Sequence, residues 1–317
     1  MRFCLMLEGQ EGPTWDRWLE IAAMCERLGF EGLFSSDHYS SVMGVSGRGS
    51  HDAWTILAGL AARTERLRLG TLVSPVTFRL PTVLAKVATT VDRISGGRVE
   101  LGIGAGWWED EHRTHGFPFP STGERMEMLE EQLEIVHGLF TRPSLTFESR
   151  HYALEDCTFL HKPLQRPHPP IIVGGKGGPR IAALVARWGD EFNTVGGSPE
   201  DVRERFARVR DAVDAAGRDQ AEVTTSLMTW FYVGADEAEV MARVERARQL
   251  DPRSGDPQTH LAELRRTCIV GTPEQAAERL SEYAAAGVER VMLNDELFDE
   301  LDMIELLAAE VLPRVEG

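Results

Sequence analysis

The residues of this sequence best suited to acid–base chemistry are an adjacent carboxylate and imidazole, Asp37 and His38. They follow a short apolar run that has the composition of a strand. A carboxylate beside an imidazole can hold a polar ligand and move a proton near neutral pH. An aspartate that caps a loop, next to a histidine that packs locally, would give the same pattern. The two are therefore candidate catalytic residues whose role depends on where the fold places them.

A glycine-rich segment with two tryptophans is a second candidate, in residues 102–108, GIGAGWW. Alternating glycines let a flat ring or a phosphate approach the backbone closely, because no side chain stands in the way. Indole rings add stacking surface and a hydrogen-bond donor. A tight turn followed by core tryptophans is the alternative interpretation. The candidate cofactor contacts in this segment are Gly104, Ala105, Gly106 and Trp107.

Residues 174–180, GGKGGPR, are the strongest candidate for binding an anion. The glycines leave backbone N–H groups uncovered, and the proline fits the first turn of a following helix. The positive end of that helix favours a phosphate. The spacing differs from the GxxxxGK[ST] pattern of nucleotide P-loops, so ATP and GTP are not indicated. The candidate phosphate contacts are Gly175, Lys176, Gly177 and Gly178.

Val73 and Ser74 follow a third apolar run and complete the candidate cofactor contacts, although a plain strand end would look the same. No metal site is predicted. His112 and His115 lie three residues apart in an acidic stretch, but the sequence has no HExxH motif. It also has no GxSxG motif of the kind that presents a nucleophilic serine.

The elements that must position these residues alternate between short apolar runs and amphipathic stretches of helical period. Strands are predicted near residues 2–7, 31–36, 67–73, 98–103, 170–173, 190–194, 223–233 and 288–293. Helices are predicted near residues 14–28, 51–64, 81–94, 122–140, 178–188, 198–216, 235–250 with 273–286, and 299–315. This alternation is typical of a parallel sheet covered by helices.

Eight strand–helix units in a chain of this length predict a (β/α)8 TIM barrel, as a single domain over residues 1–317. An open, doubly wound sheet is the alternative. Such a sheet usually has a glycine fingerprint after its first strand, and residues 8–13, EGQEGP, do not fit it. In a barrel the active site is built from loops at the C-terminal ends of the strands, which is where the candidate segments lie.

Two segments interrupt the alternation. Residues 141–169 form an insertion after strand four and its helix that is rich in proline, histidine and aromatic residues. Residues 251–260, DPRSGDPQTH, are predicted to be a mobile loop inside the seventh unit. Long irregular loops in compact domains are usually functional lids or simply flexible.

The composition is that of a soluble globular protein, with 42% hydrophobic and 26% charged residues. A net charge of -16 disfavours nucleic acids and anionic membranes as partners. No apolar run approaches the roughly 20 residues of a membrane span, and the start of the chain is too short for a signal peptide. Four scattered cysteines without a CxxC motif indicate reduced thiols and a cytoplasmic location.

Five motifs together resemble the bacterial luciferase-like monooxygenase superfamily, in the branch that uses the deazaflavin coenzyme F420. They are SDH at 36–38, LGTLVSP at 69–75, SGGR at 95–98, LGIGAGW at 101–107 and GGKGG at 174–178. The resemblance covers essentially the whole chain, in order, and it implies a TIM barrel. It also implies a homodimer, a small-molecule substrate and possible dependence on a separate flavin or deazaflavin reductase.

The resemblance further implies roles for the candidate residues. Asp37 is expected at the ring system of the cofactor and His38 at its reacting face, as the proton carrier. A non-prolyl cis peptide within residues 72–74 is expected behind the ring. The glycine strip at 104–106 is expected along the cofactor, and Gly177 with Gly178 at its phosphate. The insertion and the loop of the seventh unit are expected to shape substrate access.

The predicted function is transfer of a hydride between the C5 carbon of F420 and a small organic substrate. Sugar-phosphate dehydrogenases of this family have a glutamate directly after the glycine strip, where this chain has Trp107, so a sugar phosphate is not predicted. One alternative is an FMN-dependent monooxygenase that uses molecular oxygen. Another is a non-catalytic flavin-binding protein on the same scaffold. A barrel lyase or aldolase is less consistent, because no Schiff-base lysine follows a strand.

Overall fold

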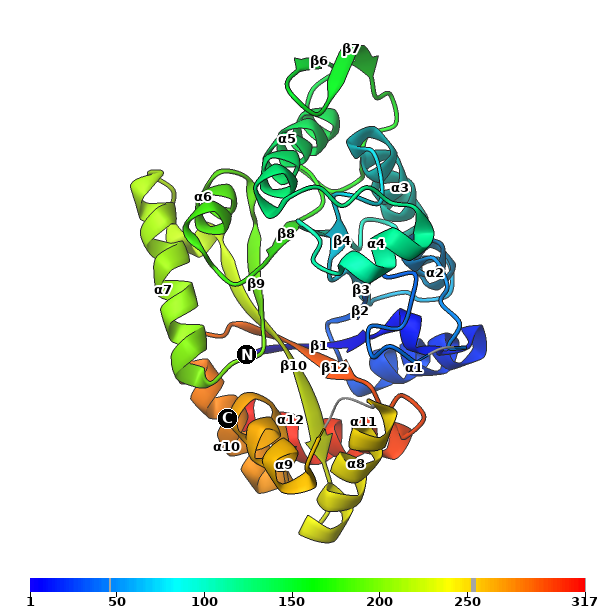
Figure 1. Cartoon of the computed structure of the whole chain (residues 1–317), viewed down its shortest axis with the longest axis vertical. Helices are drawn as coiled ribbons and strands as arrows, with labels where there is room; N and C mark the ends of the chain where they lie inside the picture. The colour runs from blue at the N-terminus through cyan, green and yellow to red at the C-terminus, as the bar shows by residue number, and fades with distance from the viewer. Residues whose placement is uncertain (46, 252–254, 317) are drawn as a thin grey trace.

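The protein folds into a closed barrel of parallel strands surrounded by helices (Figure 1). The structure is a computed structural model that describes residues 1–45, 47–251 and 255–316. In this part of the chain the eight barrel strands are β1 (Arg2–Leu7), β2 (Gly32–Ser35), β3 (Arg68–Thr71), β5 (Val99–Gly104), β8 (Ile171–Gly174), β9 (Glu191–Val195), β10 (Thr224–Val233) and β12 (Arg290–Asp295). Strand β10 pairs with both β9 and β12, which closes the circle and confirms the predicted (β/α)8 barrel.

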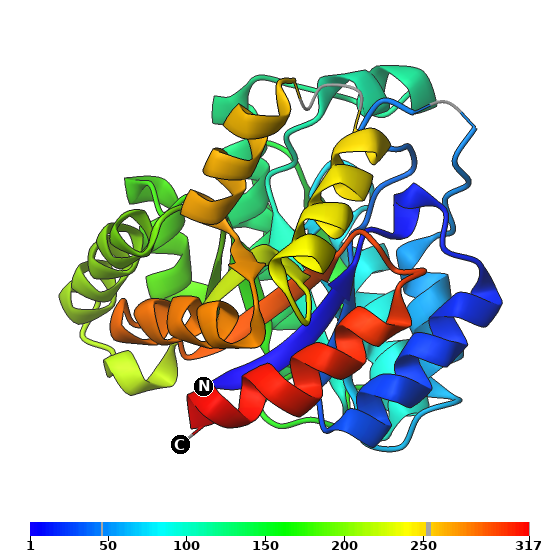
Figure 2. The same cartoon turned by 90° about the horizontal axis from the view of Figure 1, so that it is seen from below.

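The helices that cover the barrel also match the predicted positions. They are α1 (Trp15–Leu28), α2 (Ala53–Ala61), α3 (Pro81–Ser95), α5 (Thr122–Thr141), α6 (Pro179–Trp188), α7 (Pro199–Ala215), α8 (Glu237–Leu250), α10 (Pro273–Ala285), and a last helix formed by α11 (Leu301–Leu306), a π-turn (Leu307–Val311) and α12 (Leu312–Glu316). Figure 2 shows the first and last helices side by side, where Arg27 pairs with Glu305 at 2.6 Å. Among the described residues, no helix is long and apolar enough to cross a membrane.

Local capping signals explain where these helices begin and end. The Thr14 side chain accepts a hydrogen bond from the Arg17 N–H at the start of α1, and Gly29 ends that helix with a φ of 87°. Helix α5 begins with a reciprocal capping box between Ser121 and Glu124. The boundaries therefore follow from sequence signals that act over a few residues.

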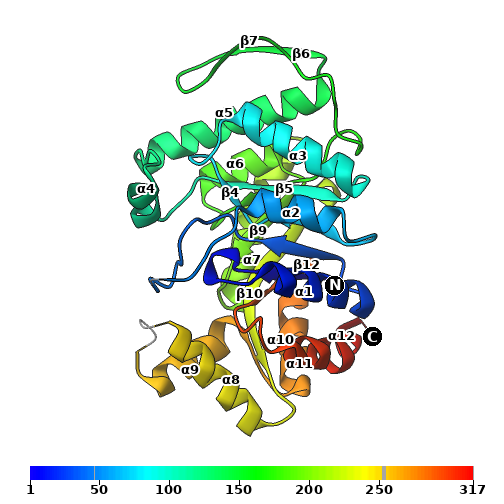
Figure 3. The ribbon, with the colours of Figure 1, turned by 90° about the vertical axis from the view of Figure 1, so that its right-hand side faces the viewer.

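Several smaller elements were not predicted by the sequence pattern. They are the short strands β4 (Ser74–Pro75) and β11 (Ile269–Gly271), the 3-10 turns at Gly9–Glu11 and Gln220–Glu222, helices α4 (Glu109–His115) and α9 (Pro257–Thr267), and the hairpin of β6 (Ser144–Glu148) and β7 (Ala153–Thr158). The hairpin occupies the predicted insertion and lies beyond α5 (Figure 3), where Arg150 pairs with Glu127 at 2.9 Å.

The prediction of a loop over residues 251–260 is wrong for its last part, which is the first turn of α9. Asp256 caps this helix by accepting a hydrogen bond from the Thr259 N–H, and Pro257 occupies the first turn. These are ordinary helix-start signals that the loop interpretation overlooked. Residues 252–254 lie outside the described residues.

One cluster of buried apolar side chains consists of Cys4, Met6, Phe34, Leu72, Ile172, Met228 and Met292. A larger apolar core lies between the strands and the surrounding helices. The interior is therefore packed rather than open, as is usual for barrels of this size.

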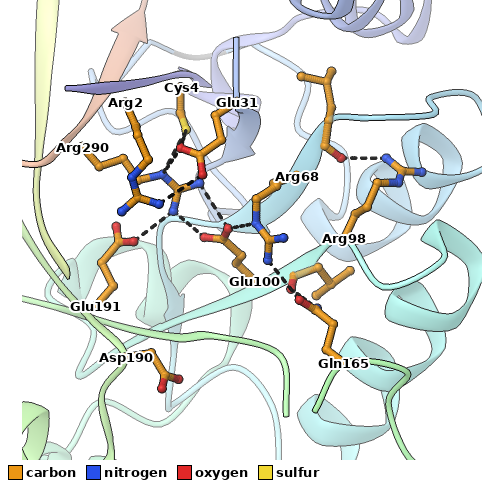
Figure 4. A network of polar contacts seen from close by, with 12 residues as sticks. Arg2, Cys4, Glu31, Arg68, Arg98, Glu100, Gln165, Asp190, Glu191 and Arg290 are labelled. Carbon is orange, nitrogen blue, oxygen red and sulfur yellow. Dashed lines mark hydrogen bonds and ion pairs between the residues drawn. The ribbon is translucent and has the colours of Figure 1, made fainter. Parts of the chain in front are cut away.

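Charged side chains fill the interior at the N-terminal ends of the strands (Figure 4). Arg290 Nη1 lies 2.6 Å from Glu100 Oε2 and 2.9 Å from Glu191 Oε2, and Arg68 also pairs with Glu100. Although burial alone would raise it, the Arg290 and Arg68 guanidiniums hold the pKa of Glu100 below its ordinary value. An ion network fills this end of the barrel, which leaves the opposite rim as the place for a ligand.

Candidate active site

The candidate residues predicted from the sequence converge on one rim of the barrel. They follow the C-terminal ends of β2, β3, β5 and β8, and these strands are parallel neighbours in the sheet. The placed residues are Asp37, His38, Val73, Ser74, Gly104, Ala105, Gly106, Trp107, Gly175, Lys176, Gly177 and Gly178. This is the end of a barrel at which enzymes of this architecture carry their active sites.

Asp37 is buried and joins the loops that follow β2 and β3. Its Oδ2 atom accepts hydrogen bonds from Ser74 Oγ at 2.6 Å and from Arg79 Nη1 at 2.5 Å. Arg79 also pairs with Asp52 at 2.7 Å, and Trp54 Nε1 donates to Ser74 Oγ at 3.0 Å. Burial raises the pKa of Asp37 even though Arg79 opposes this effect. Asp37 therefore fixes the position of the neighbouring chain around Ser74.

The peptide bond between Leu72 and Val73 is cis, as expected for residues 72–74. The Val73 side chain lies over two of the rim glycines. A Cβ atom on Gly104 would be 2.7 Å from Val73 Cγ2, and one on Gly174 would be 2.9 Å from Val73 Cγ1. These two glycines thus have a structural role that the sequence pattern does not reveal, because they make room for the valine that lies between β3 and β4.

His38 forms a close pair with Glu111, a residue of α4. His38 Nδ1 lies 2.8 Å from Glu111 Oε2, and the Glu111 side chain is fully buried. The other carboxylate oxygen accepts hydrogen bonds from the backbone N–H groups of Tyr39 and Ser40. Sequence reasoning missed Glu111. A helical reading of residues 109–115 would have placed Glu111 and His112 together on the buried side.

The pair shifts the acid–base properties of both groups. Although burial alone would lower it, the nearby carboxylates of Glu111, Glu8 and Asp37 raise the pKa of His38 above its ordinary value. Burial would raise the pKa of Glu111, but the hydrogen bonds that it accepts hold that pKa below its ordinary value. The arrangement favours an ionised glutamate beside a protonated histidine.

Two indole rings flank the histidine. The ring centroids of Trp107 and Trp108 lie 5.9 Å and 6.2 Å from that of His38, in edge-on geometry. Trp107 leaves 64% of its surface exposed, a large fraction for a tryptophan. The ring predicted to stack on a ligand is therefore free at the rim, next to the candidate proton carrier.

The other side of the rim carries carboxylates that sequence reasoning did not single out. Glu8 accepts hydrogen bonds from Asn294 Nδ2 at 2.8 Å and from Gln10 Nε2 at 2.7 Å. Tyr232 Oη donates to Glu296 Oε1. Burial and nearby carboxylates, Glu8 among them, raise the pKa of Glu296 to about 7. This side of the rim can therefore also exchange protons near neutral pH.

The oligoglycine loop between β8 and α6 has the features of an anion site. Gly177 has a φ of 65°, and Gly178 is the N-cap residue of α6. The backbone N–H groups of residues 176–178 find no acceptor among the residues that the structure describes. Arg208 Nε donates to the Gly177 carbonyl at 3.1 Å and supports the loop from behind. Unpartnered N–H groups at the start of a helix fit a phosphate group.

No cluster of three or more His, Cys, Asp or Glu side chains that could hold a metal ion occurs in the described ranges. The rim brings together a candidate proton carrier, an exposed indole, a valine surface and a candidate anion-binding loop. These are elements of a site for a flat molecule with a phosphate group.

Comparison with known proteins places these elements in context. Residues 1–290 match the family described as luciferase-like monooxygenase. The FMNH(2)-dependent dimethylsulfone monooxygenase of Pseudomonas putida is 28% identical, over 93% of this chain and 86% of that protein. The F420-dependent glucose-6-phosphate dehydrogenase of Microbacterium testaceum is 29% identical, over 96% of this chain and 94% of that protein. The crystal structure of monooxygenase RslO1 from Streptomyces bottropensis superposes with a TM-score of 0.85, at 27% identity and 99% coverage of both chains.

Proposed function

This chain belongs to the luciferase-like monooxygenase family, and we propose that it is a coenzyme F420-dependent oxidoreductase acting on a small organic substrate. The observation that carries the proposal is His38, held by Glu111 at the barrel rim beside the exposed Trp107. Transfer of a hydride to a carbonyl or unsaturated carbon needs an accompanying proton. His38 is the rim side chain best suited to supply it.

The residues at the rim fit the cofactor. The free N–H groups of residues 176–178 suit its phosphate, and Lys176 adds a positive charge in a chain of net charge -16. Val73 provides an apolar surface for a flat ring, over Gly104 and Gly174. When bound, reduced F420 supplies a hydride from its C5 carbon.

The side chains of the protein then perform three tasks. His38 gives a proton to the substrate, or removes one in the reverse reaction, at Nε2, because Nδ1 is engaged by Glu111. Asp37 holds the Val73 surface in place through its hydrogen bond with Ser74. The exposed ring of Trp107 offers a surface that would shield the bound molecules from water.

The proposal is tested by titrating the purified protein with oxidised F420 and, separately, with FMN while cofactor fluorescence is followed. We expect F420 to bind with the higher affinity. Binding of FMN alone would refute the choice of cofactor.

The position of the phosphate is tested by Gly177→Val. A Cβ atom there would lie 3.2 Å from the Arg205 carbonyl oxygen, and the φ of 65° disfavours any side chain. We expect cofactor affinity to fall at least roughly tenfold, as lost charge-assisted hydrogen bonds imply. Gly217→Val is the matched control, because Gly217 also has a positive φ but lies just beyond the C-cap of α7, Ala216. Unchanged affinity in Gly177→Val would move the phosphate elsewhere.

An FMN-dependent monooxygenase is the second candidate function. It is supported by the 28% identity with the dimethylsulfone monooxygenase and by the anion loop, which suits the phosphate of FMN equally well. This alternative predicts oxygen consumption with reduced FMN and a suitable substrate.

We further propose that the protein is a homodimer in the cytoplasm. Analytical ultracentrifugation should then give twice the mass of one chain.

A further inference from the structure

We propose that Glu111 is a positioning residue that keeps His38 in its doubly protonated form, with Nε2–H available to the substrate, so that His38 is the proton donor of a reductive reaction. This inference rests on the proposed function and concerns the same rim. It gives Glu111, which lies outside the sequence motifs, the task of orienting His38. It also specifies that the proton moves from His38 to the substrate.

The first step of the argument is the fixed orientation of the Glu111 carboxylate. Its Oε1 atom accepts the backbone N–H groups of Tyr39 and Ser40, so its Oε2 atom is left to face His38 Nδ1 at 2.8 Å. An ionised carboxylate can only accept hydrogen bonds. The proton between the two side chains must therefore reside on Nδ1 of the imidazole. The Nε2 atom has no hydrogen-bond partner within the described part of the chain.

The second step is that α4 holds Glu111 in place at several points. His112 Nε2 lies 2.6 Å from Thr77 Oγ1, and His112 Nδ1 lies 2.7 Å from the Trp108 carbonyl oxygen. One turn later, His115 Nε2 lies 2.8 Å from Ser40 Oγ. The helix is thus tied to the loops that follow β2 and β4. The Glu111–His38 contact is therefore built into the fold rather than made by a free surface side chain.

The third step is the charge around the imidazole. Three carboxylates act on His38 from separate elements: Glu111 from α4, Glu8 after β1, and Asp37 after β2. Arg79, which follows β4, is already paired with Asp37 and Asp52. Tyr39 Oη accepts from the same arginine at 3.4 Å. The net effect raises the pKa of His38 despite its burial, so the imidazolium form persists to higher pH than in an ordinary histidine.

An imidazolium at the reacting face is suited to give a proton rather than to take one. In the reductive direction the Nε2–H bond breaks and an O–H bond forms on a carbonyl substrate, which has received its electron pair with the hydride. Solvent then returns a proton to Nε2. The protein gains and loses no electrons, so the cycle balances with the hydride donor already named.

A purely structural role, in which Glu111 only ties α4 to the β2 loop, makes different predictions for Glu111→Gln. The glutamine keeps the size of the side chain and an Oε1 atom for the N–H groups of Tyr39 and Ser40. Its NH₂ group must then face His38 Nδ1, which has to become an acceptor. The substitution therefore preserves the backbone contacts but moves the proton of neutral His38 from Nδ1 to Nε2. Replacing the aspartate of a catalytic triad with asparagine has the same effect on the triad histidine.

The first experiment is ¹⁵N NMR of the imidazole groups of the full chain, with His38→Gln used to assign the His38 signals. In the wild type we expect the neutral form of His38 to carry its proton on Nδ1. In Glu111→Gln we expect the proton on Nε2 and a lower pKa of His38. Asp110→Asn is the matched control on the same helix, because Asp110 and Arg113 form an exposed pair at 3.0 Å. An unchanged tautomer and pKa of His38 in Glu111→Gln would overturn the inference.

The second experiment measures the pH dependence of reduction by reduced F420. A proton donor must be protonated, so the rate should fall as the pH rises through the pKa of His38. In Glu111→Gln we expect turnover to drop at least about tenfold and this falling limb to move to lower pH, with cofactor affinity unchanged. A rate that rises through the same pKa would make His38 a base and refute the donor role.

The two proposals can fail separately. The NMR titration needs no cofactor, so it decides the role of Glu111 even if the protein binds FMN and the proposed function is wrong. Conversely, the protein could bind F420 while the tautomer and pKa of His38 stay unchanged in Glu111→Gln. That result would keep the proposed function but remove Glu111 from the mechanism.

Discussion

Asp37 and Arg79 form a buried ion pair in which Arg79 Nη1 lies 2.5 Å from Asp37 Oδ2. The same carboxylate oxygen receives the Ser74 hydroxyl, next to the residue that lies over the rim glycines. Asp37, which is expected at the cofactor, therefore also links the loop after β2 to the segment around Ser74. Its contribution to stability can be separated from its contribution to activity.

Replacing Arg79 with methionine should destabilise the protein by about 3 kcal/mol, because it leaves Asp37 buried without a cation. Urea denaturation gives this free energy of unfolding. The double variant Asp37→Asn with Arg79→Met should recover part of the loss, since an uncharged amide is cheaper to bury. A double variant as unstable as the sum of the single variants would show that the ion pair is not the cause.

Gly104→Ala should be destabilised by roughly 1–3 kcal/mol, the usual cost of overpacking, because its Cβ atom would be 2.7 Å from Val73 Cγ2. Adding Val73→Ala should restore most of the stability by removing the clashing methyl group. Gly49→Ala serves as the control, because Gly49 has no heavy atom within 4 Å of the added carbon. Equal losses in both glycine variants would show that the clash with Val73 is not the cause.

These contacts show what sequence reasoning could and could not find. The eight strands and the main helices were predictable, because their periodicity and caps act over a few residues. The position of His38 at the rim was predictable because barrel active sites lie at the C-terminal ends of the strands. The partner of His38 did not, because Glu111 is 73 residues away on a helix of seven residues with no apolar stripe. The packing of Val73 against Gly104 and Gly174 is likewise a contact between segments that lie far apart in the sequence.

Asp295, at the end of β12, should make stability fall as the pH rises. Burial raises its pKa from the ordinary 3.8 to about 8, and its Oδ2 atom has no partner among the described residues. A carboxyl whose pKa is higher in the folded state binds its proton more tightly there, so stability is lost between the unfolded and folded pKa values. Asp295→Asn removes this loss.

We therefore expect Asp295→Asn to match the wild type near pH 4 and to exceed it at pH 8. One unit of pKa shift corresponds to about 1.4 kcal/mol, so the gain at pH 8 should be at least that large. Urea titrations at several pH values measure the difference. Curves that stay parallel across this range would mean that Asp295 is not protonated in the folded protein.

His38→Ala should lower turnover by roughly 100-fold or more while cofactor affinity stays within about twofold. Turnover is lost because the proton at Nε2 is removed, whereas the anion loop and the Val73 surface are unchanged. Added imidazole should recover part of the rate, since it can enter the space left by the side chain and carry the same proton. His161→Ala, an exposed histidine of the segment before β8, is the control. A variant that turns over at the wild-type rate would require the proton to come from another group, and Glu296, whose pKa is about 7, would be the next to test.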